Sequence, residues 1–511
     1  MNRKIFELDA ADRALKEARD TGKSIVLCHG VFDLLHIGHI RHLEAARRNG
    51  DFLVVSITSD RYVNKGPDRP VFPAEVRADV LAALGIVDMV TVVDHSSAEP
   101  AIEAIRPTVY VKGSEYAEPA KDITGKITRE QGLVEKHGGR VVFTHEMTFS
   151  SSNLLNTHFN LLDKAALAYL KGVREADGEA KIVGALDKIQ NMRILVIGET
   201  IIDHYCYVAA MGKSSKESII ATLAQGEEFF VGGVIAAANH LSSICPNVHV
   251  ISMLGDGVSS DNYEATVRDQ MQAGVTADFV YRPNGPTVQK TRFVEPTYVR
   301  KLFEVYKMDD SPLPAEIQES FHRRLEQKLK EVDMVIVCDF GHGFLTAETI
   351  RLLEKKAPFL AVNAQSNAGN IGYNLVTKYH RADFVCIDAM EARLAAKDKH
   401  ASWSEVVLRT IPNMVACPNI VVTHGKMGCY TSGGDDGGIV HIPAFTGDVV
   451  DTVGAGDAFF VMAAPFVAAG ATCALAGFVG NAAGAIKVGI IGHRRYLSKL
   501  EIQRYISTLL K

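Results

Sequence analysis

Two histidines at the start of a helical pattern could bind the phosphates of a nucleotide. His36 and His39 stand in the stretch Gly30–His39 (GVFDLLHIGH), which follows an apolar run. A helix start carries unpaired N–H groups and partial positive charge, and both favour phosphate. Imidazoles there can donate hydrogen bonds to a triphosphate, and Gly38 lets the phosphates approach the backbone. Paired helical histidines are more often surface or core residues, but the strand-to-helix context favours a phosphate site.

A carboxylate flanked by glycines could perform a second kind of chemistry. The stretch Asp451–Phe459 (DTVGAGDAF) places small residues before a long apolar helix. The N–H groups of Val453 to Asp457 could form an anion pocket for a transferring phosphoryl group. Asp457 would then stand at the helix start, where it could take a proton from an attacking hydroxyl. Without its surroundings, such a motif is equally well explained as a turn with Asp457 as the helix cap.

The first stretch resembles the nucleotidyltransferase superfamily that includes glycerol-3-phosphate cytidylyltransferase and the heptose-1-phosphate adenylyltransferases. The resemblance covers about residues 22–156 and includes a lysine loop at 65–70, an arginine at 77, V-K-G at 111–113 and serines at 150–152. It implies that a sugar-phosphate oxygen attacks the α-phosphorus of a nucleoside triphosphate and that pyrophosphate leaves. Alignment and charge neutralisation then supply the catalysis.

The same resemblance implies a role for each matching residue. His36 and His39 bind the triphosphate, and Lys65 and Arg77 stabilise charge. Asp33 contacts the sugar phosphate or a metal. The remaining nucleotide or phosphate contacts are expected at Gly30, Phe32, Gly38, Lys112, Gly113, Ser150, Ser151 and Ser152. Two alternatives stay open, because Arg77 could be a solvated helix residue and the serines a plain turn.

The second stretch closely resembles the D-T-x-G-A-G-D signature of the PfkB/ribokinase family of sugar and nucleoside kinases. The resemblance spans about residues 192–508 and implies that Asp457 is the catalytic base. Thr423, Gly425 and Gly428, with Gly454, Ala455 and Gly456, are expected to bind nucleotide or phosphate. The sugar side is expected to comprise Asp203, Gly232, Gly233 and Asn239. Asp388 and Glu391 stand where the family has its N-x-x-E segment near Mg²⁺.

Three departures from the kinase pattern concern the sugar and metal sides. Ala236 occupies the place of an asparagine found in heptose-kinase members, so that Asn239 is the nearest asparagine. The strand at 362–365 (VNAQ) replaces a D-P-K-like segment, and Asp388 replaces asparagine. The resemblance therefore implies phosphoryl transfer but leaves the identity of the sugar open.

Alternating strand and helix patterns indicate the elements that would position these residues. In the first part, strands are expected at 24–28, 52–58, 89–93, 108–112 and 141–144, with a helix at 38–49. In the second, strands are expected at 193–198, 249–253, 334–338, 359–363, 383–387 and 420–423, with a small extra sheet within 216–306 and two closing helices. We therefore predict an α/β protein with a Rossmann-like nucleotidyltransferase domain (1–158), a helical linker (159–191) and a ribokinase-like domain with a β lid (192–511). Each domain should have a mainly parallel sheet with helices on both faces.

Composition limits the possible partners and location. The 511-residue chain has a formal net charge of −5, which offers no global basic field for nucleic acid. Proline, glycine, asparagine and lysine interrupt the apolar region 458–492, so two packed helices explain it better than a membrane span. Eight scattered cysteines without a C-x-x-C pair indicate reduced thiols in a cytoplasmic protein. Lid strands could also pair across a homodimer, as in relatives.

Together the two halves resemble a fusion in reversed order relative to the bifunctional heptose-phosphate kinase/adenylyltransferases. The expected function is ATP-dependent phosphorylation of a sugar or sugar phosphate, with nucleotidyl transfer from ATP or CTP to a sugar or polyol phosphate. Mg²⁺ is expected in both sites because it bridges phosphates. The alternative is a single active nucleotidyltransferase whose kinase-like domain senses a sugar. The retained Asp457 favours the bifunctional reading.

Overall fold

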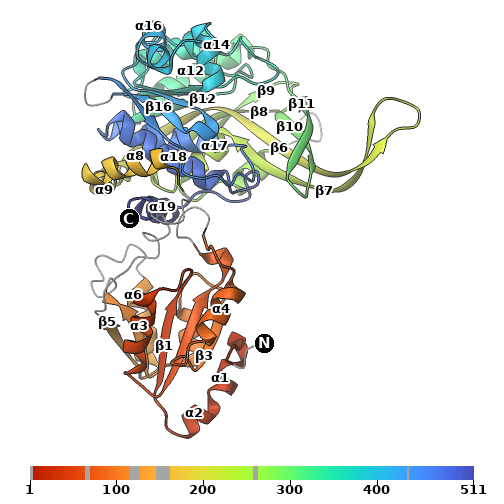
Figure 1. Cartoon of the computed structure of the whole chain (residues 1–511). Coiled ribbons are helices and arrows are strands. Elements are labelled where there is room, and N and C mark those ends of the chain that lie inside the picture. Colours follow the sequence, from red (N-terminus) through yellow and green to blue (C-terminus); the bar gives the residue numbers. More distant parts are fainter. Residues whose placement is uncertain (1–3, 64–68, 115–125, 145–161, 257–262, 434–436) are drawn as a thin grey trace. The chain divides into compact units, whose positions relative to one another are not determined.

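The computed structural model describes residues 4–63, 69–114, 126–144, 162–256, 263–433 and 437–511 (Figure 1). The chain divides into two compact units. The first comprises Met1–Asp163 with Gln503–Leu509 and Lys511, and the second comprises Lys164–Ile502 with Leu510. The helices at 164–189, which the sequence assigns to a linker, group with the second unit.

The first unit contains a five-stranded sheet in which every pairing is parallel, as predicted. Its order is β3-β2-β1-β4-β5, and apolar clusters lie on both faces of the sheet. The strands are β1 (Ile25–Gly30), β2 (Phe52–Thr58), β3 (Met89–Val93), β4 (Val109–Gly113) and β5 (Arg140–Thr144). The helices are α1 (Ala11–Ala14), α2 (Lys16–Asp20), α3 (Ile37–Arg47), α4 (Ala74–Ala82), α5 (Glu99–Ile105) and α6 (Lys126–Lys136).

The strand order of this sheet reverses at β1. The chain moves from β1 outward to β2 and β3, and then returns to place β4 on the other side of β1. Ligands of such sheets bind at the carboxyl ends of the strands where the order reverses. The turn from β1 to α3, which carries the two histidines, lies at this point.

The second unit has a larger sheet whose central strands are parallel. Counted from one edge, its main order is β9-β8-β6-β12-β13-β14-β15-β16-β17, and only the last two pairings, β15 with β16 and β16 with β17, are antiparallel. The strands are β6 (Ile194–Lys213), β8 (Val248–Gly255), β9 (Val275–Arg282), β12 (Met334–Asp339), β13 (Leu360–Ala364), β14 (Phe384–Asp388), β15 (Ile420–Thr423), β16 (Cys429–Ser432) and β17 (Ile439–Ile442). This arrangement confirms the predicted second α/β domain.

The helices of the rest of the chain lie between these strands and after the last one. They are α8 (Lys164–Glu175), α9 (Gly178–Ile189), α10 (Val234–Leu241), α11 (Glu264–Asp269), α12 (Ala315–Lys328), α13 (Ala347–Lys356), α14 (Ala389–Ala396), α15 (Trp403–Glu405), α16 (Ile411–Met414), α17 (Ala455–Ala468), α18 (Cys473–Lys487) and α19 (Lys499–Leu509). The two predicted closing helices are α17 and α18, and the sequence reading missed α19, which follows them.

Strand β6 also takes part in a smaller sheet, which we call the lid. The first residues of β6 belong to the main sheet, and the remainder of β6 pairs with β7 (Ile220–Gly233) and β10 (Val288–Glu295), beyond which lies β11 (Arg300–Lys307). Figure 1 shows β6 and β7 extending together as a long hairpin. The predicted extra sheet is thus present, but β6 is 20 residues long and does not end at Gly198 as expected.

Side chains on the lid strands alternate between two faces, as the period of a strand requires. We call inner row the set that shares a face with Asp203 and outer row the set that shares a face with His204. By register, the inner row holds Asp203, Tyr205, Phe230, Lys290, Arg292, Glu304 and Tyr306. The outer row holds His204, Cys206, Glu227, Phe229, Gln289, Thr291, Phe293, Phe303 and Val305.

Within the described part of the chain, no helix has both the length and the apolar character needed to cross a bilayer.

Candidate active sites

The turn after β1 places two imidazoles side by side at the start of α3. His36 is the N-cap residue, and its Nδ1 accepts a hydrogen bond of 3.1 Å from the Gly38 N–H. The rings of His36 and His39 stack with their centroids 4.0 Å apart, and Phe32 meets His39 edge-on at 5.3 Å. Because Nδ1 of His36 is the acceptor, its neutral ring carries the proton on Nε2. In this tautomer the Nε2–H group can donate toward an anion.

Asp33 has a different environment from the expected one. Its buried carboxylate accepts a hydrogen bond of 3.0 Å from the Phe72 N–H and lies 3.3 Å from Nη1 of Arg69. These contacts tie the turn after β1 to the segment that precedes α4. Asp33 therefore acts here as an anchor for the loop, and no contact with substrate is needed to explain it.

Arg77 is a correction to the sequence reading. Its side chain on α4 is buried and donates to the carbonyls of Phe72 (2.8 Å), Val31 (2.6 Å) and Thr58 (2.9 Å). It also pairs with Asp60. A guanidinium held by four inward hydrogen bonds is not a solvated helix residue, and it does not reach out to a phosphate. Its role in this conformation is to fix the ends of β1 and β2.

Lys112 ends the buried run of β4 and forms an ion pair inside the fold. Its Nζ lies 3.4 Å from Oε2 of Glu130, which also accepts a hydrogen bond of 3.0 Å from the Tyr110 hydroxyl. Gly113 follows at the end of the strand. The lysine stands at the carboxyl edge predicted for phosphate contacts, but a buried carboxylate already balances its charge.

Four residues expected in this site lie outside the described residues. They are Lys65, Ser150, Ser151 and Ser152. Their predicted contacts with the nucleotide remain predictions.

In the second unit, the start of α17 has the geometry of an anion site. Gly454 is its N-cap with φ of 73°, and a Cβ there would lie only 2.6 Å from Cε1 of His493. Ala455, Gly456 and Asp457 form the first turn of the helix. Only glycine combines this backbone conformation with such close packing. The Ala455 N–H donates to the Thr452 carbonyl at 3.2 Å, and the helix start as a whole favours negative charge beside it.

Asp457 is a buried carboxyl poised to exchange a proton. Burial raises its pKa to about 6, and a hydrogen bond from Gln365 Nε2 opposes that rise. Gln365 also donates to Oδ1 of Asn363 at 2.9 Å. The segment that replaces the family's D-P-K-like strand therefore positions the predicted base through Gln365. A carboxyl with this pKa is mostly ionised at neutral pH and can still accept a proton there.

The inner row of the lid supplies charged groups beside this carboxyl. Asp203 forms a buried ion pair with Arg292, and its Oδ2 lies 3.6 Å from Nε2 of His493. Lys290 is also buried, with its ammonium 5.2 Å from the centroid of the Tyr306 ring. Asp203 and Lys290 both influence the pKa of Asp457, which places them near it. The structure thus brings the predicted Asp203 and Asp457 together.

The two glycines that end β7 let the lid close against the main sheet. A Cβ at Gly232 would lie 2.1 Å from Oδ2 of Asp203, and one at Gly233 would lie 2.4 Å from the Glu199 carbonyl. Glu199 is itself buried and accepts hydrogen bonds from the N–H groups of Phe340 (3.1 Å) and His342 (2.9 Å). Gly232 therefore lies against Asp203, and the predicted sugar contacts of both residues remain predictions.

Asn239 is a second correction. Its buried amide on α10 donates to the Gln270 carbonyl at 3.0 Å and accepts from the Gln272 N–H at 2.9 Å. Both ends of the amide therefore hold the loop between α11 and β9. The side chain has a structural task and does not replace the missing sugar-binding asparagine.

The buried ammonium of Lys487 links the loop before α17 to the segment that follows α18. Lys487 is fully buried at the end of α18, and its Nζ donates to the carbonyls of Val453 (2.7 Å), Gly492 (2.9 Å) and Ile490 (3.4 Å). Burial lowers its pKa to about 8. Asp451 supports the same loop by accepting from the Gly492 N–H at 2.8 Å.

The expected nucleotide side lies at the carboxyl ends of β14 and β15. Thr423 ends β15, and Gly425 (φ 51°) and Gly428 (φ 84°) shape the tight turn into β16. A Cβ at Gly428 would lie 1.9 Å from the Ile442 carbonyl, so this turn requires glycine. The three residues lie at the edge where parallel sheets bind ligands.

Asp388 and Glu391 form a capping box at the start of α14. Asp388 accepts from the N–H groups of Met390 (2.7 Å) and Glu391 (3.0 Å), and Glu391 returns a contact by accepting from the Asp388 N–H at 2.8 Å. The other oxygen of Glu391 accepts from the Ser366 N–H at 2.8 Å. Both oxygens of Glu391 thus accept from backbone amides, and the predicted Mg²⁺ contacts of the pair remain a prediction.

The sequence reading missed Gln365, Lys290, Arg292, Lys487 and His493. Lys487 carried the clearest signal, because a charge inside a long apolar region needs a buried partner. Lys290 and Arg292 alternate along a strand, which indicates one common face. Gln365 lies in the segment 362–365 that departs from the kinase pattern, whereas His493 carried no local signal, because it reaches the site through a distant pairing.

Comparisons with known proteins agree with this geometry. Residues 191–499, more than half of the chain, match the family described as pfkB family carbohydrate kinase, and residues 27–156 match the family described as cytidylyltransferase-like. Curated relatives called "Bifunctional protein HldE" match the N-terminal part. The protein of Syntrophotalea carbinolica is 42% identical over 129 residues (25% of each chain), and that of Methylobacillus flagellatus is 47% identical over 117 residues (22% of this chain, 24% of the relative). The chain thus spans about a quarter of the length of these relatives.

Solved structures of similar shape cover the second unit. A ribokinase from Thermotoga maritima has a TM-score of 0.49 and 19% identity over 62% of this chain and 99% of its own. Phosphofructokinase-2 from Escherichia coli has a TM-score of 0.49 and 16% identity over 62% of this chain and 100% of its own. With the family matches and the geometry of both sites, the chain belongs to the pfkB family of carbohydrate kinases and carries a cytidylyltransferase-like domain ahead of its kinase domain.

Proposed function

We propose that the chain is a bifunctional enzyme of nucleotide-sugar precursor synthesis with a heptose-like sugar. Its second unit would phosphorylate a sugar or sugar phosphate with ATP. Its first unit would transfer a nucleotidyl group from ATP or CTP to a sugar or polyol phosphate and release pyrophosphate. The name of the curated relatives supports two activities in one chain, although the aligned part is short.

The proposed kinase step begins at Asp457. Its ionised carboxylate takes the proton of a sugar hydroxyl as the hydroxyl oxygen attacks the γ-phosphorus of ATP. The bond between the γ-phosphorus and the bridging oxygen breaks, and ADP leaves. The amides at the start of α17 balance charge on the transferring group. Such a base contributes about 10²–10⁴-fold in rate.

The inner row of the lid supports an anionic sugar as substrate. Arg292 pairs with Asp203 and Glu304, and the buried Lys290 adds a second cation to the same face of the lid. A buried cation is costly unless an anion accompanies it. A phosphate already present on the sugar would supply that charge, which favours a sugar phosphate over a neutral sugar.

The proposed transferase step is a direct displacement at α3. A phosphate oxygen of the sugar phosphate attacks the α-phosphorus of the nucleotide. The bond between the α-phosphorus and its bridging oxygen to the β-phosphorus breaks, and pyrophosphate leaves. His36 and His39 donate hydrogen bonds to the phosphates, with the amides of the helix start beside them. No covalent intermediate is formed on the protein.

Mg²⁺ would reach each site with its nucleotide, as an ion that bridges phosphate oxygens. The capping box of Asp388 and Glu391 supports this view, because the oxygens of Glu391 are already used by backbone amides.

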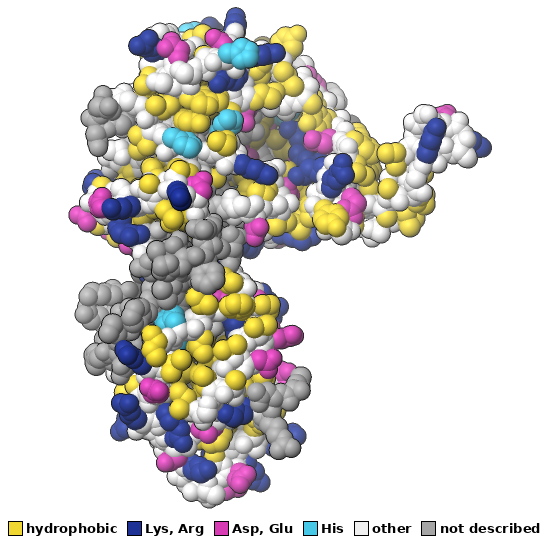
Figure 2. All heavy atoms as spheres, in the orientation of Figure 1, with side chains coloured by type: hydrophobic (Ala, Val, Ile, Leu, Met, Phe, Trp, Pro, Cys, Tyr) yellow, Lys and Arg dark blue, Asp and Glu magenta, His cyan; other side chains and the backbone are white. Residues whose placement is uncertain are grey.

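A second copy of the chain would cover the lid. Hydrophobic side chains are exposed along the β6–β7 hairpin (Figure 2), namely Met211, Ile219, Ile220 and Leu223. Exposed apolar groups of this kind are typical of protein contacts. Light scattering should give the mass of a dimer, and Ile220→Asp should give a monomer. A monomeric wild-type protein would contradict this part of the proposal.

The eight free cysteines support a cytoplasmic location.

The observation that carries the proposal is the pair of separate helix starts, one with stacked imidazoles and one with a buried carboxyl. Incubation with each of ATP, CTP, GTP and UTP and a panel of sugars and sugar phosphates should test it. ADP and pyrophosphate should both form, each with its own substrate. Binding of a sugar phosphate without any ADP would favour the sensing alternative and contradict the kinase assignment.

A further inference from the structure

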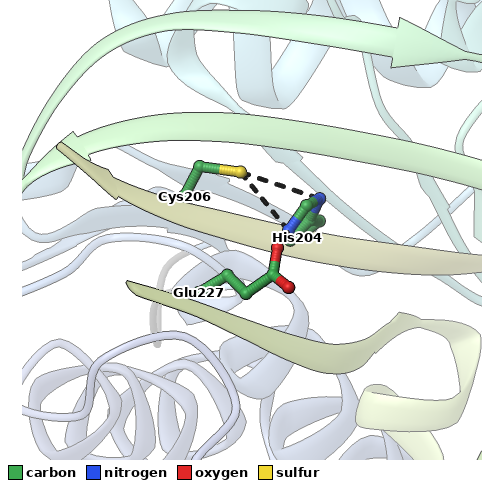
Figure 3. A group of neighbouring side chains, drawn as sticks. All are labelled: His204, Cys206 and Glu227. Atoms are coloured by element: carbon green, nitrogen blue, oxygen red, sulfur yellow. Dashed lines mark hydrogen bonds and ion pairs between the residues drawn. The ribbon is translucent and has the colours of Figure 1, made fainter. Parts of the chain in front are cut away.

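Three side chains with metal-binding atoms converge on the outer row of the lid. His204 and Cys206 lie on β6, and Glu227 lies opposite them on β7 (Figure 3). One ligand atom from each, a nitrogen, a sulfur and an oxygen, lies within 4.8 Å of the other two. Imidazole, thiolate and carboxylate together form a donor set that suits Zn²⁺ and related transition ions.

The three side chains meet at the imidazole of His204. Oε2 of Glu227 lies 2.8 Å from Nε2, and Sγ of Cys206 lies 3.3 Å from Nε2 and 3.8 Å from Nδ1. A neutral ring has one proton, so Nε2 cannot satisfy both neighbours by donation. Tetrahedral zinc sites, with bonds of about 2.0–2.3 Å, separate their ligand atoms by roughly 3.3–3.7 Å. The N–S distance is at the lower end of that spacing, and the N–O contact is about 0.5 Å shorter than it.

Neighbouring side chains hold the imidazole in the orientation that this role requires. Phe229 stacks on the ring of His204 with centroids 4.0 Å apart and planes inclined by 9°. The hydroxyl of Thr291 and the amide nitrogen of Gln289 each lie 3.4 Å from the other ring nitrogen, Nδ1. A proton on Nδ1 directed at that hydroxyl leaves the lone pair on Nε2. Metal-binding histidines commonly have such a partner, which fixes the tautomer.

The cluster is separate from the kinase site. His204 and Cys206 alternate along β6 with Asp203 and Tyr205, which belong to the inner row. The cluster is also open to solvent on one side, because the Glu227 side chain is 62% exposed. The side chain of His204 is 13% exposed. A fourth ligand could therefore be water. An ion here would join β6 to β7 near the base of the hairpin.

We propose that His204, Cys206 and Glu227 bind one divalent transition-metal ion of the Zn²⁺ class, with water at the fourth position. The ion would cross-link the two strands of the lid hairpin. This inference is independent of the substrates proposed above, since the outer row faces away from the inner row.

Cobalt binding tests the proposal directly. The purified full-length protein would be treated with a chelator under reducing conditions, dialysed and titrated with Co²⁺. Because seven of the eight cysteines are buried and Cys206 is not, a thiolate-to-cobalt absorption band should report Cys206. We expect saturation at one ion per chain with that band, and competition by Zn²⁺. Cys206→Ser should abolish the band, and His204→Ala should weaken binding by more than about tenfold.

A matched control is available on another surface. His249 also contacts an exposed carboxylate, Asp278, at 3.1 Å, but this pair has no third ligand among the residues that the structure describes. His249→Ala should leave the cobalt spectrum and the affinity unchanged. Wild-type protein without a thiolate band, or a band that persists in Cys206→Ser, would overturn the proposal. Both measurements use folded protein, and circular dichroism of each variant would show that it is folded.

Discussion

Replacing Asp457 by asparagine should stabilise the kinase unit at neutral pH while it removes phosphoryl transfer. Burial raises the pKa of Asp457 from 3.8 to about 6. A carboxyl whose pKa is higher in the folded chain than in the unfolded chain favours unfolding once it is ionised. This penalty is absent below the ordinary pKa and complete above the raised one, so stability is lost as the pH rises from about 4 to about 7. Asparagine has no such charge.

The size of the effect follows from the difference of about two pKa units. At 1.36 kcal/mol for each unit, Asp457→Asn should gain about 3 kcal/mol at pH 8. At pH 4 the gain should fall to about 0.5 kcal/mol, because the folded carboxyl is then protonated and the unfolded one is only partly ionised. The amide oxygen can still accept the hydrogen bond from Gln365, which keeps the substitution conservative.

Urea unfolding followed by tryptophan fluorescence measures this gain in the free energy of unfolding of the kinase unit. Trp403 is the only tryptophan of the chain, and it packs in the kinase unit against Tyr430 (5.3 Å between centroids) and Arg393 (4.0 Å). Asp451→Asn is the matched control with the opposite expected sign, because Asp451 accepts hydrogen bonds from Tyr205 and Lys301. A loss of stability in Asp457→Asn at pH 8, or an equal gain at pH 4, would refute the reasoning.

Three further substitutions test the surrounding contacts. Gln365→Leu removes a hydrogen bond that lowers the pKa of Asp457. The acid limb of the pH profile of kinase kcat/KM, measured as ADP formation, should therefore move to higher pH. An unchanged acid limb would contradict this contact. Lys487→Met leaves three buried carbonyls without their donor. It should lower the urea midpoint of unfolding followed by Trp403 fluorescence and should lower kinase kcat, with partial recovery in ammonium salts. A fully active variant would show that the ammonium does not hold the loop before α17. Arg77→Met should destabilise the first unit by on the order of 3 kcal/mol, because three backbone carbonyls lose their donor. The loss should appear as faster hydrogen exchange in β2. Unchanged exchange would argue for a solvated arginine.

Local patterns in the sequence were sufficient for the parts of the sites that lie on one element. The strand-to-helix turn of His36 and the glycine-flanked Asp457 could be placed because caps and helix starts depend on neighbouring residues. The capping box of Asp388 and Glu391 was equally readable, since an acidic residue followed three positions later by glutamate is its known signature. The resemblance to a metal-binding segment obscured that simpler explanation.

Contacts between distant segments could not be predicted in the same way. The burial of Arg77 depends on carbonyls from three separate segments of the first unit. The pairing of Asp203 with Arg292 depends on the register of β6 against β10, which are almost ninety residues apart. The length of β6 was missed because its outer half alternates between two mixed rows and has no single apolar face.

The central claim is that two helix starts in one chain serve two separate reactions. Its most direct test is to measure ADP and pyrophosphate formation in parallel for the wild type, His36→Ala and Asp457→Asn. We predict that His36→Ala loses pyrophosphate formation and keeps ADP formation, and that Asp457→Asn shows the reverse. If either substitution abolished both activities in a protein that remained folded, the account of two independent sites would be contradicted.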